Sequence, residues 1–291
     1  MSDAARLHQA GRPSSSTWVF NLIDLLVTLL LWTYFTAGFV VLFAPFYLLA
    51  AMLASDGARA FQRLNHLFYR GFFRLCRLTM PRQKWRIDSA VTTVRSAVVV
   101  CNHVSYIDPL LLISLFAQHT TIVKNRLLRI PIFGWMLTLS GYLPAESQGP
   151  LAGRMVEQLE QMPGFLAAGG NLIVFPEGTR SRNGAVGTLN AGAFKIARLC
   201  RAPLAVVRIE NSDRLFTPGR FLFNTCRANT ISVRLLAQVT PPYDSVQFSV
   251  KELMGQVRAL LEAPAEAGSS QDAATRPGAA QQSALKPKGV R

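Results

Sequence analysis

Cysteine is scarce and scattered in this chain of 291 residues. The four cysteines form no C-x-x-C pair, and no histidine stands at zinc-finger spacing from them. They are Cys76, Cys101, Cys200 and Cys226. Disulfide scaffolds and structural zinc sites rest on such pairs, so the pattern argues against both kinds of site. It predicts reduced thiols in a domain that faces a cytosol.

Acidic residues are also few, with 16 Asp and Glu against 31 Lys and Arg, which gives a formal net charge of +15. A surplus of this size predicts a polyanionic partner, either nucleic acid or an anionic lipid surface. The sequence contains no RNA- or DNA-binding motif, so we expect membrane lipids and no nucleic acid as partners.

One long apolar run stands near the N-terminus, in a chain with 50% hydrophobic residues and a mean hydropathy of +0.23. Residues 17–54 are almost wholly apolar, and Asn21 and Asp24 are the strongest exceptions. The run is nearly twice the roughly 20 residues of one membrane span. It is also much longer than the apolar part of a secretory signal, about 7–15 residues. Three interpretations stay open: one long span that continues into the interface, a helical hairpin bent near Gly38 to Pro45, or a buried hairpin of a soluble protein.

Residues 55–95 are strongly basic, with nine Lys and Arg against Asp56 and Asp88. Only Arg6 and Arg12 precede the apolar run. Because positive charge concentrates on the cytoplasmic side of a span, the bulk of the protein is predicted on the cytoplasmic face, of the inner membrane in a bacterium.

Part of this basic segment has the pattern of an amphipathic helix. Its arginines share one stripe and its large apolar residues the opposite side, which is typical of a helix in the headgroup plane with its apolar side in the lipid. A solvated basic face is the alternative. The stripe is Arg59, Arg63, Arg70, Arg74 and Arg77, with His66 beside it, and the apolar side is Leu64, Phe68, Phe72 and Leu75.

Short apolar runs alternate with helical patterns from Ser96 onward, which predicts an α/β domain with a mixed, mostly parallel sheet flanked by helices. Residues 127–140 are expected to form one helix that contains Pro131, and a last helix is expected to start at Ser249 with a capping box. The composition predicts disordered ends. The predicted regions are 1–16 disordered, 17–54 membrane-embedded, 55–95 interfacial helix and linker, 96–263 α/β domain and 264–291 disordered tail.

His103 ends the apolar strand predicted over 97–103, and Asp108 follows at a helix start. Functional groups collect where the strands of an open α/β sheet end. A carboxylate beside an imidazole fixes its tautomer and stabilises the imidazolium, so His103 is a candidate general base on an alcohol. Asp108 followed by Pro109 is equally what an ordinary helix cap looks like.

A second polar turn, FPEGTR at 175–180, also follows a buried strand, the one predicted over 171–175. Gly178 permits a tight turn, and the residues after it supply hydroxyl and guanidinium donors suited to a phosphate. The candidate binding residues are Glu177, Gly178, Thr179 and Arg180, with Ser181 and Arg182 beyond them.

Together, NHVSYID (102–108) and FPEGTR (175–180) resemble two motifs of the glycerolipid acyltransferase family, which contains the lysophosphatidate acyltransferases. The resemblance covers 98–209. It implies that His103 deprotonates an acceptor hydroxyl, that Asp108 orients His103, and that the alkoxide attacks an acyl thioester on coenzyme A or acyl carrier protein. It also implies that Glu177 to Arg180 hold a glycerol phosphate, and that the protein needs no metal or bound cofactor.

The sequence departs from the family pattern at two places. The stretch 141–147, GYLPAES, has no arginine where the family's second motif usually carries one, and Val206 stands at a usual proline of the fourth. Lys124 and Arg126 are candidates to replace the arginine. The expected acceptor is 1-acyl-sn-glycerol-3-phosphate, and a different hydroxylated lipid such as a lyso-ornithine lipid is the alternative.

Two further functions remain to be separated from acyl transfer. One is a non-catalytic protein that binds anionic lipid, and the other is a hydrolase of acyl thioesters or lipids. The absence of a G-x-S-x-G elbow argues against a serine-hydrolase mechanism. Cys101 shares the strand face of His103, but a small buried cysteine is ordinarily a core residue.

Overall fold

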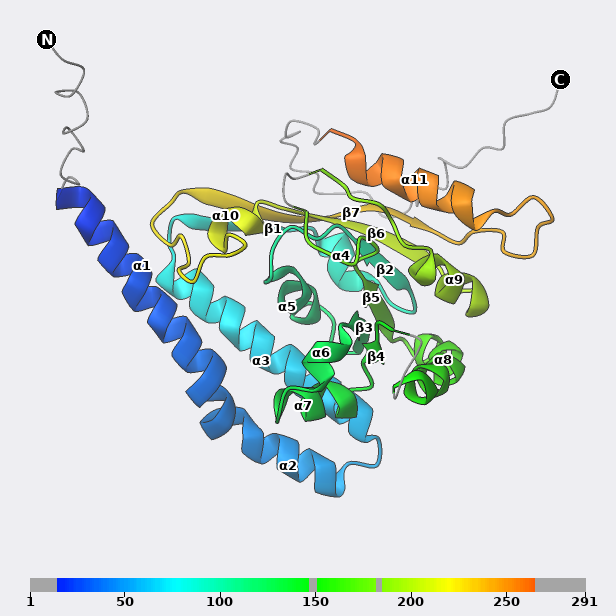
Figure 1. Cartoon of the computed structure of the whole chain (residues 1–291), viewed down its shortest axis with the longest axis horizontal. Coiled ribbons are helices and arrows are strands. Elements are labelled where there is room, and N and C mark those ends of the chain that lie inside the picture. Colours follow the sequence, from blue (N-terminus) through cyan, green and yellow to red (C-terminus); the bar gives the residue numbers. More distant parts are fainter. Residues whose placement is uncertain (1–14, 147–150, 182–184, 265–291) are drawn as a thin grey trace, which may run out of the picture.

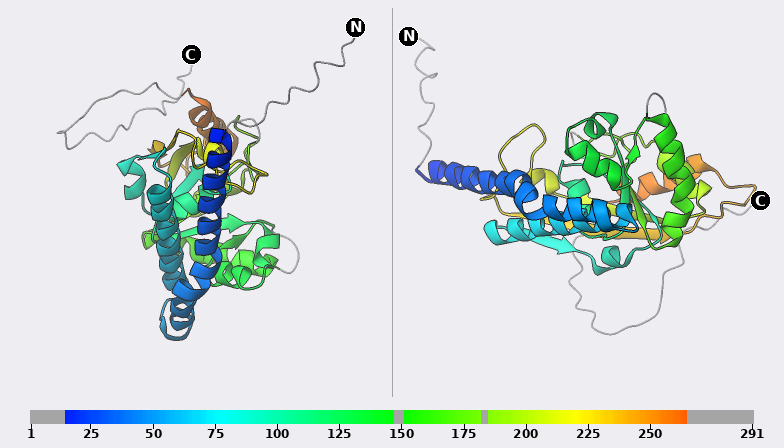
Figure 2. Two further views of the ribbon diagram at one scale, coloured as in Figure 1. Left: turned by 90° about the vertical axis from the view of Figure 1, so that its left-hand side faces the viewer. Right: turned by 90° about the horizontal axis from the view of Figure 1, so that it is seen from below.

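The computed structural model describes residues 15–146, 151–181 and 185–264 (Figure 1). Both predicted disordered ends lie almost wholly outside the described residues, as do Ser147 and Arg182 of the two motif stretches. The described chain builds one sheet with helices on both sides and a long helical arm at the N-terminal end (Figures 1 and 2).

The sheet has seven strands in the order β1-β7-β6-β2-β5-β3-β4. All neighbouring strands run parallel except β6 and β7, which are antiparallel. The predicted fold class, an α/β domain with a mixed and mostly parallel sheet, is confirmed. The strands are β1 (Gln83–Ile87), β2 (Val98–Cys101), β3 (His119–Val123), β4 (Leu143–Pro144), β5 (Asn171–Val174), β6 (Leu204–Glu210) and β7 (Asn229–Val239).

The central strands are buried on both faces, which explains their unbroken apolar runs. In β2, Val99 and Cys101 join a core cluster with α3 (Gly57–Thr79), α5 and α7, whereas Val98 and Val100 join a second cluster with α8, α9 and α11. The helices of the domain are α4 (Ser89–Thr93), α5 (Asp108–Ile113), α6 (Asn125–Leu128), α7 (Phe133–Leu139), α8 (Ala152–Ala167), α9 (Gly192–Leu199), α10 (Ser212–Leu215) and α11 (Val250–Glu262).

The apolar run forms α1 (Ser15–Thr33), a π-helical segment η2 (Tyr34–Phe43) and α2 (Ala44–Leu53), which follow one another without a break. The axis bends where η2 meets Pro45 in the first turn of α2 (Figure 1), because π-turns and proline both interrupt the α-helical hydrogen-bond ladder. The chain reverses only after Leu53, so a hairpin closed between Gly38 and Pro45 is not what forms. Over Trp18–Leu53 this helix is long and apolar enough to cross a membrane.

The helix α3 (Gly57–Thr79) runs back beside η2 and α2 (Figures 1 and 2). Its apolar side is not free to enter lipid, which corrects the expectation of a helix lying apolar side down on the membrane. Phe68 and Phe72 are buried, and Tyr34 and Phe35 pack their rings against both. The apolar side of α3 therefore belongs to the protein core, while Arg63, Arg70, Arg74 and Arg77 remain exposed on its other side.

Two other local expectations differ from the structure. The helix expected over 127–140 is broken into α6 and α7, because Pro131 lacks a backbone donor and Ile132 has a φ of +65°. The sheet also starts earlier than Ser96, since β1 lies within the segment expected to be interfacial helix and linker. The capped helix expected from Ser249 is confirmed as α11, with the Ser249 hydroxyl accepting from the Glu252 amide.

Candidate active site

The two motif loops leave the sheet at the same edge, because β2 and β5 are parallel neighbours. Val100 pairs with Val174, so the chain emerges from both strands side by side. His103 stands two residues after β2, and Glu177 three residues after β5. The topology thus brings NHVSYID and FPEGTR together, although they are about seventy residues apart in the chain.

His103 and Asp108 form a close pair. Asp108 Oδ2 lies 3.1 Å from His103 Nδ1, and the carboxylate is fully buried whereas the imidazole is partly exposed. Because an ionised carboxylate only accepts hydrogen bonds, this contact places the proton on Nδ1 and leaves Nε2 as an acceptor. Among the described residues none donates to Nε2, and the ring packs on Phe175 with centroids 4.5 Å apart. The pair has the arrangement of a general base with its orienting carboxylate.

Asp108 is more than a helix cap. It is the first residue of α5, and Ile107 occupies the cap position. Besides the imidazole, Oδ2 accepts from the backbone amides of Val104 and Ser105 at 2.7 Å each. Oδ1 accepts from the Ser212 hydroxyl at 2.5 Å. Four donors therefore hold the carboxylate, which fixes the direction from which it meets the imidazole.

The FPEGTR loop and the residue after it form hydrogen bonds to both the amide and the carbonyl of His103. The Glu177 carboxylate, 8% exposed, accepts from the His103 amide at 3.1 Å and from the Gly187 amide at 2.8 Å. The amide of Ser181 donates to the His103 carbonyl at 2.7 Å. Both oxygens of Glu177 are thus used in joining loops, so the geometry favours a positioning task for Glu177 over contact with a substrate.

The turn itself explains the glycine in FPEGTR. The Gly178 amide donates to the Phe175 carbonyl at 3.0 Å, and Gly178 has a φ of +65°, a conformation that residues with a Cβ rarely adopt. The turn leaves Thr179 exposed next to Arg180.

Arg180 reaches across to the first motif loop. Its Cζ lies 3.3 Å from the centroid of the Tyr106 ring, and its buried Nη1 has no hydrogen-bond partner among the described residues. Stacking on an aromatic face holds a guanidinium in one orientation while its donors stay available for an anion. Among the predicted binding residues, Arg180 therefore combines a position beside the His103 loop with a buried donor that has no described partner.

Two residues that position the first motif loop at the carboxyl ends of the strands were not predicted from the sequence. The Asn102 side chain makes two hydrogen bonds of 2.8 Å with the backbone of Ile209 in β6, which anchors the start of the first loop. Ser212 holds Asp108 from a position more than a hundred residues away. The place of Asn102 beside His103 was a usable signal, whereas nothing in the sequence around Ser212 indicates its partner.

Cys101 is a core residue, as expected from its type. It is fully buried, and burial raises the pKa of its thiol, with the nearby charges of Asp108 and Glu177 raising the pKa further. A thiol in this environment stays protonated and is a poor nucleophile. This agrees with a chemistry centred on the imidazole.

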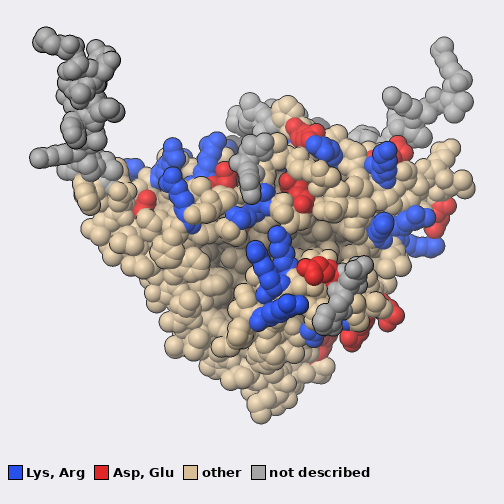
Figure 3. Space-filling model, viewed as in Figure 1, with Lys and Arg blue, Asp and Glu red and all other residues tan. Residues whose placement is uncertain are grey.

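Residues 141–147, which lack the arginine usual in the family's second motif, are joined by a hydrogen bond to Asn125, the residue after Lys124. The Asn125 amide group donates to the Glu146 carboxylate at 3.1 Å. Lys124 and Arg126 are exposed, and Lys124 directly follows β3, the strand beside β5. Basic side chains gather on this face over α6 (Figure 3). Cationic candidates for an anionic ligand therefore stand at the same sheet edge as Arg180.

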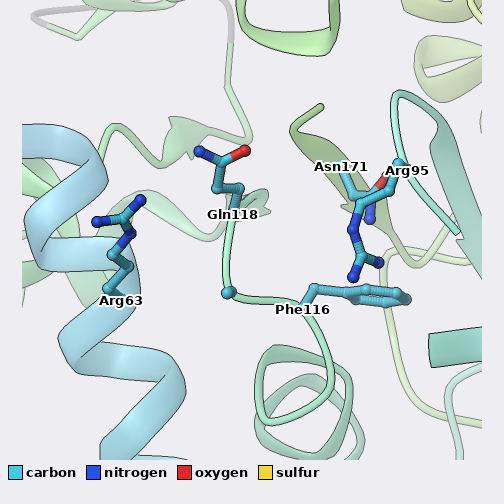
Figure 4. Close-up of a pocket in the computed structure, with 6 residues that line it drawn as sticks. Arg63, Arg95, Phe116, Gln118 and Asn171 are labelled. Atoms are coloured by element: carbon cyan, nitrogen blue, oxygen red, sulfur yellow. The ribbon is translucent and has the colours of Figure 1, made fainter. Parts of the chain in front are cut away.

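A cavity lies at the opposite edge of the sheet (Figure 4). It has a volume of about 210 Å³, and its polar lining is Arg63, Arg95, Gln118 and Asn171. Asn171 begins β5, and Gln118 directly precedes β3, so this cavity is at the amino ends of the parallel strands. Among the described residues no cluster of three His, Cys, Asp or Glu side chains has the arrangement of a metal site.

Known proteins resemble this chain in sequence. The sequence model of the family described as Acyltransferase matches residues 84–210. The chloroplastic 1-acyl-sn-glycerol-3-phosphate acyltransferase LPAT1 of Arabidopsis thaliana is 31% identical over 42% of this chain and 34% of its own length. The 1-acyl-sn-glycerol-3-phosphate acyltransferase of Escherichia coli (strain K12) is 26% identical over 66% of this chain and 76% of its own length. The matches with the plant proteins span about a third of those proteins' length.

A solved structure also resembles the fold. The crystal structure of the 1-acyl-sn-glycerophosphate acyltransferase PlsC from Thermotoga maritima superimposes with a TM-score of 0.62 and 24% identity, covering 82% of this chain and 94% of that one. Both sequence motifs, 102–108 and 175–180, lie within the segment that the family model matches. Residues 84–210 of this chain therefore match the acyltransferase family in sequence.

Proposed function

We propose that this protein is a membrane-bound O-acyltransferase that moves a fatty acyl group from acyl-CoA or acyl carrier protein to the free hydroxyl of a lysolipid. The favoured acceptor is 1-acyl-sn-glycerol-3-phosphate, which would give phosphatidic acid. The observation that carries the proposal is the joined pair of loops: His103 is oriented by Asp108 and held through its backbone by Glu177 and Ser181, beside the stacked Arg180.

The geometry supports a direct transfer without an acyl-enzyme intermediate. His103 Nε2 takes the proton from the acceptor hydroxyl as its oxygen attacks the thioester carbonyl. The C–S bond then breaks, and the thiolate leaves with the proton from the imidazolium. Asp108 keeps the ring in the reactive tautomer and stabilises the imidazolium between these steps. A thioester is already activated, so a positioned base and a held acceptor suffice, and the reaction needs no bound cofactor.

The acceptor's phosphate is proposed to bind Arg180, with Lys124 and Arg126 as further cations at the same edge. The free Nη1 of Arg180 supports this assignment, because a guanidinium fixed on an aromatic ring favours a phosphate oxygen in one direction. Glu146 in the second-motif stretch supports the alternative acceptor, a lyso-ornithine lipid, because this stretch has no arginine and the Glu146 carboxylate suits an amine.

The apolar arm is proposed to hold the domain at the cytoplasmic face of the membrane. Large apolar side chains of α1, η2 and α2 are exposed, among them Trp18, Val41 and Met52. No charged side chain shows over η2 and α2 on the face in Figure 3. A contiguous apolar surface of this extent fits an acyl layer, and the exposed arginines of α3 fit anionic headgroups beside it.

The test is product analysis with the purified full chain in detergent or vesicles. Acyl-CoA and acyl carrier protein donors are each combined with lysophosphatidate and with a lyso-ornithine lipid, and the lipids are identified by mass spectrometry. Phosphatidic acid as the main product supports the favoured acceptor, and an acylated ornithine lipid supports the alternative. Free fatty acid alone would mean hydrolysis, and no donor turnover with any pair would contradict the enzymatic proposal.

A further inference from the structure

One surface segment, residues 211–226, contacts both the candidate active site and the apolar arm. It begins after β6 at Asn211, contains the short helix α10, and ends before β7. Its two contacts lie on different parts of the molecule. Because the segment is the shared partner of both parts, it is a candidate mechanical link between the arm and the catalytic pair.

At the site, the segment holds Asp108 and the loop in front of it. The fully buried Ser212 hydroxyl donates to Asp108 Oδ1 at 2.5 Å, as the sole described donor to that oxygen. Four residues further, the Phe216 carbonyl accepts from the Ser105 hydroxyl at 2.8 Å. The Phe216 ring also lies 6.1 Å from the ring of Tyr106, on which Arg180 stacks. A shift of this segment would therefore move Asp108 relative to His103.

At the arm, the same segment is held by a carboxylate inside the apolar helix. Asp24 Oδ1 accepts from the Thr225 amide at 2.8 Å, the Thr225 hydroxyl at 2.5 Å and the Cys226 amide at 3.1 Å. One turn along α1, the Thr28 hydroxyl accepts from the Phe223 amide at 3.0 Å. A carboxylate in an apolar membrane helix is costly, and it is retained where it has a task and a partner.

Aromatic rings fill the space between these two contacts. Trp32 of α1 stacks on Phe221 at 5.9 Å with an interplanar angle of 8°, and Phe216 stacks on Phe223 at 4.4 Å. Trp32 also meets the edge of Phe216 at 6.5 Å. Closely packed rings transmit displacement because they have few alternative arrangements.

We infer that Ser212 and Asp24 are positioning residues of the acyl transfer. Asp24 fixes segment 211–226 on the arm, and Ser212, which belongs to that segment, holds Asp108 in place through its hydrogen bond. The inference rests on the proposed function. It goes beyond anchoring, because it makes the arm a structural part of the active site. The arm is then required for turnover even with water-soluble, short-chain donor and acceptor, where delivery of the protein to a membrane is irrelevant.

Three single variants of the full chain in detergent test this with short-chain substrates. Asp24→Leu removes the acceptor of three hydrogen bonds, and Ser212→Ala removes the donor to Asp108. Each is expected to lower kcat by about two- to thirtyfold and to leave KM within about twofold, the range for residues that act through a network. Asp24→Asn keeps a carbonyl oxygen at the same place and is expected to retain most of the wild-type kcat.

Asn21→Leu is the matched control, because Asn21 is exposed on the same helix one turn before Asp24. It places the same leucine on the arm at a residue that makes no hydrogen bond to segment 211–226 among the described residues, and it is expected to keep the wild-type kcat. Equal kcat values for Asp24→Leu and Asn21→Leu would overturn the inference. A loss confined to KM would also overturn it, since that would indicate substrate binding.

The double variant Asp24→Leu with Ser212→Ala tests whether the two residues act in series. If Asp24 works through Ser212, the double variant loses no more kcat than the worse single variant. If they act independently, the two fold-losses multiply, and the link between them is contradicted.

Amide hydrogen exchange gives a readout that does not need activity. Asp24→Leu is expected to speed exchange at the Thr225 and Cys226 amides, and also at the Val104 and Ser105 amides that donate to Asp108. Unchanged exchange at Val104 and Ser105 would overturn the link. If the wild-type protein is inactive but the exchange pattern is as expected, the proposed function fails and the structural link between the arm and Asp108 stands.

Discussion

The amino ends and the carboxyl ends of the parallel strands form two opposite edges of the sheet. Both carry similar polar side chains, but these side chains have different roles at the two edges. At the amino ends of the strands, Arg95 donates to the carbonyls of Thr92 and Val94, and the Asn171 side chain bonds to the backbone of Val94 and Ala97. These groups are used in holding the starts of β2 and β5. That edge nevertheless contains a cavity of about 210 Å³.

At the carboxyl ends, hydrogen bonds orient the side chains and leave selected atoms unused. Asp108 and Glu177 are saturated by donors, and they hold His103 so that Nε2 is left as an acceptor. Arg180 keeps a buried donor without a partner. In the proposed reaction, the chemistry therefore uses an available, oriented atom and not the empty volume at the other end of the strands.

The largest effect is expected from His103→Ala. Removal of the general base is predicted to lower kcat by about 10²- to 10⁴-fold, with the urea midpoint of unfolding little changed because the imidazole is partly exposed. Steady-state acyl transfer and urea unfolding are the measurements. Full activity in this variant would remove the base from the mechanism.

A smaller loss is expected from Asp108→Asn, together with a loss of stability. The amide that replaces the carboxylate brings donors toward the donors of His103, Val104, Ser105 and Ser212. We predict roughly a ten- to hundredfold lower kcat and about 1–3 kcal/mol less free energy of unfolding. The same two assays apply. A variant with wild-type stability would show that the four bonds are not made in solution.

Arg180→Ala is expected to act on acceptor binding. Because Arg180 is partly exposed, its contact with a phosphate is worth about 1 kcal/mol, which raises KM for lysophosphatidate by about fivefold at unchanged kcat. Arg180→Lys keeps the charge but loses the flat stacking on Tyr106, so an intermediate KM is expected. An equal rise of KM for an acceptor without phosphate would argue against the assigned contact.

The smallest effect on activity is expected from a substitution at the amino ends of the strands. Arg63→Ala opens the cavity of Figure 4 and removes one of its two arginines. Since this edge has no part in the proposed reaction, kcat and KM are predicted to stay within about twofold of wild type, the usual range for exposed substitutions. A loss comparable to that of Arg180→Ala would mean that the cavity binds a substrate.

The carboxyl edge was largely predictable from the sequence. The apolar runs of β2 and β5 mark strands buried on both faces, and each is followed at once by polar motif residues. Parallel strands end at the same edge, so His103, Asp108 and Arg180 could be expected near one another. The motif spacing could not show that Glu177 points inward to the His103 amide, because that depends on the path of the turn after Pro176.

Other features depend on long-range packing, which local patterns do not encode. The apolar side of α3 has the same pattern whether its partner is lipid or the rings of Tyr34 and Phe35. Ser212 reaches Asp108 only because β6 lies next to β2 in the sheet. Pro131 indicated a break between α6 and α7. The apolar residues on both sides of it nevertheless have helical spacing, which predicted one continuous helix.

The most direct test of the catalytic edge is a structure of the full chain with a bound lysophosphatidate analogue. We predict that its free hydroxyl lies about 2.6–3.2 Å from His103 Nε2, with the phosphate against Arg180. Binding of the analogue in the cavity between Arg63 and Arg95, with the His103 loop empty, would contradict the account.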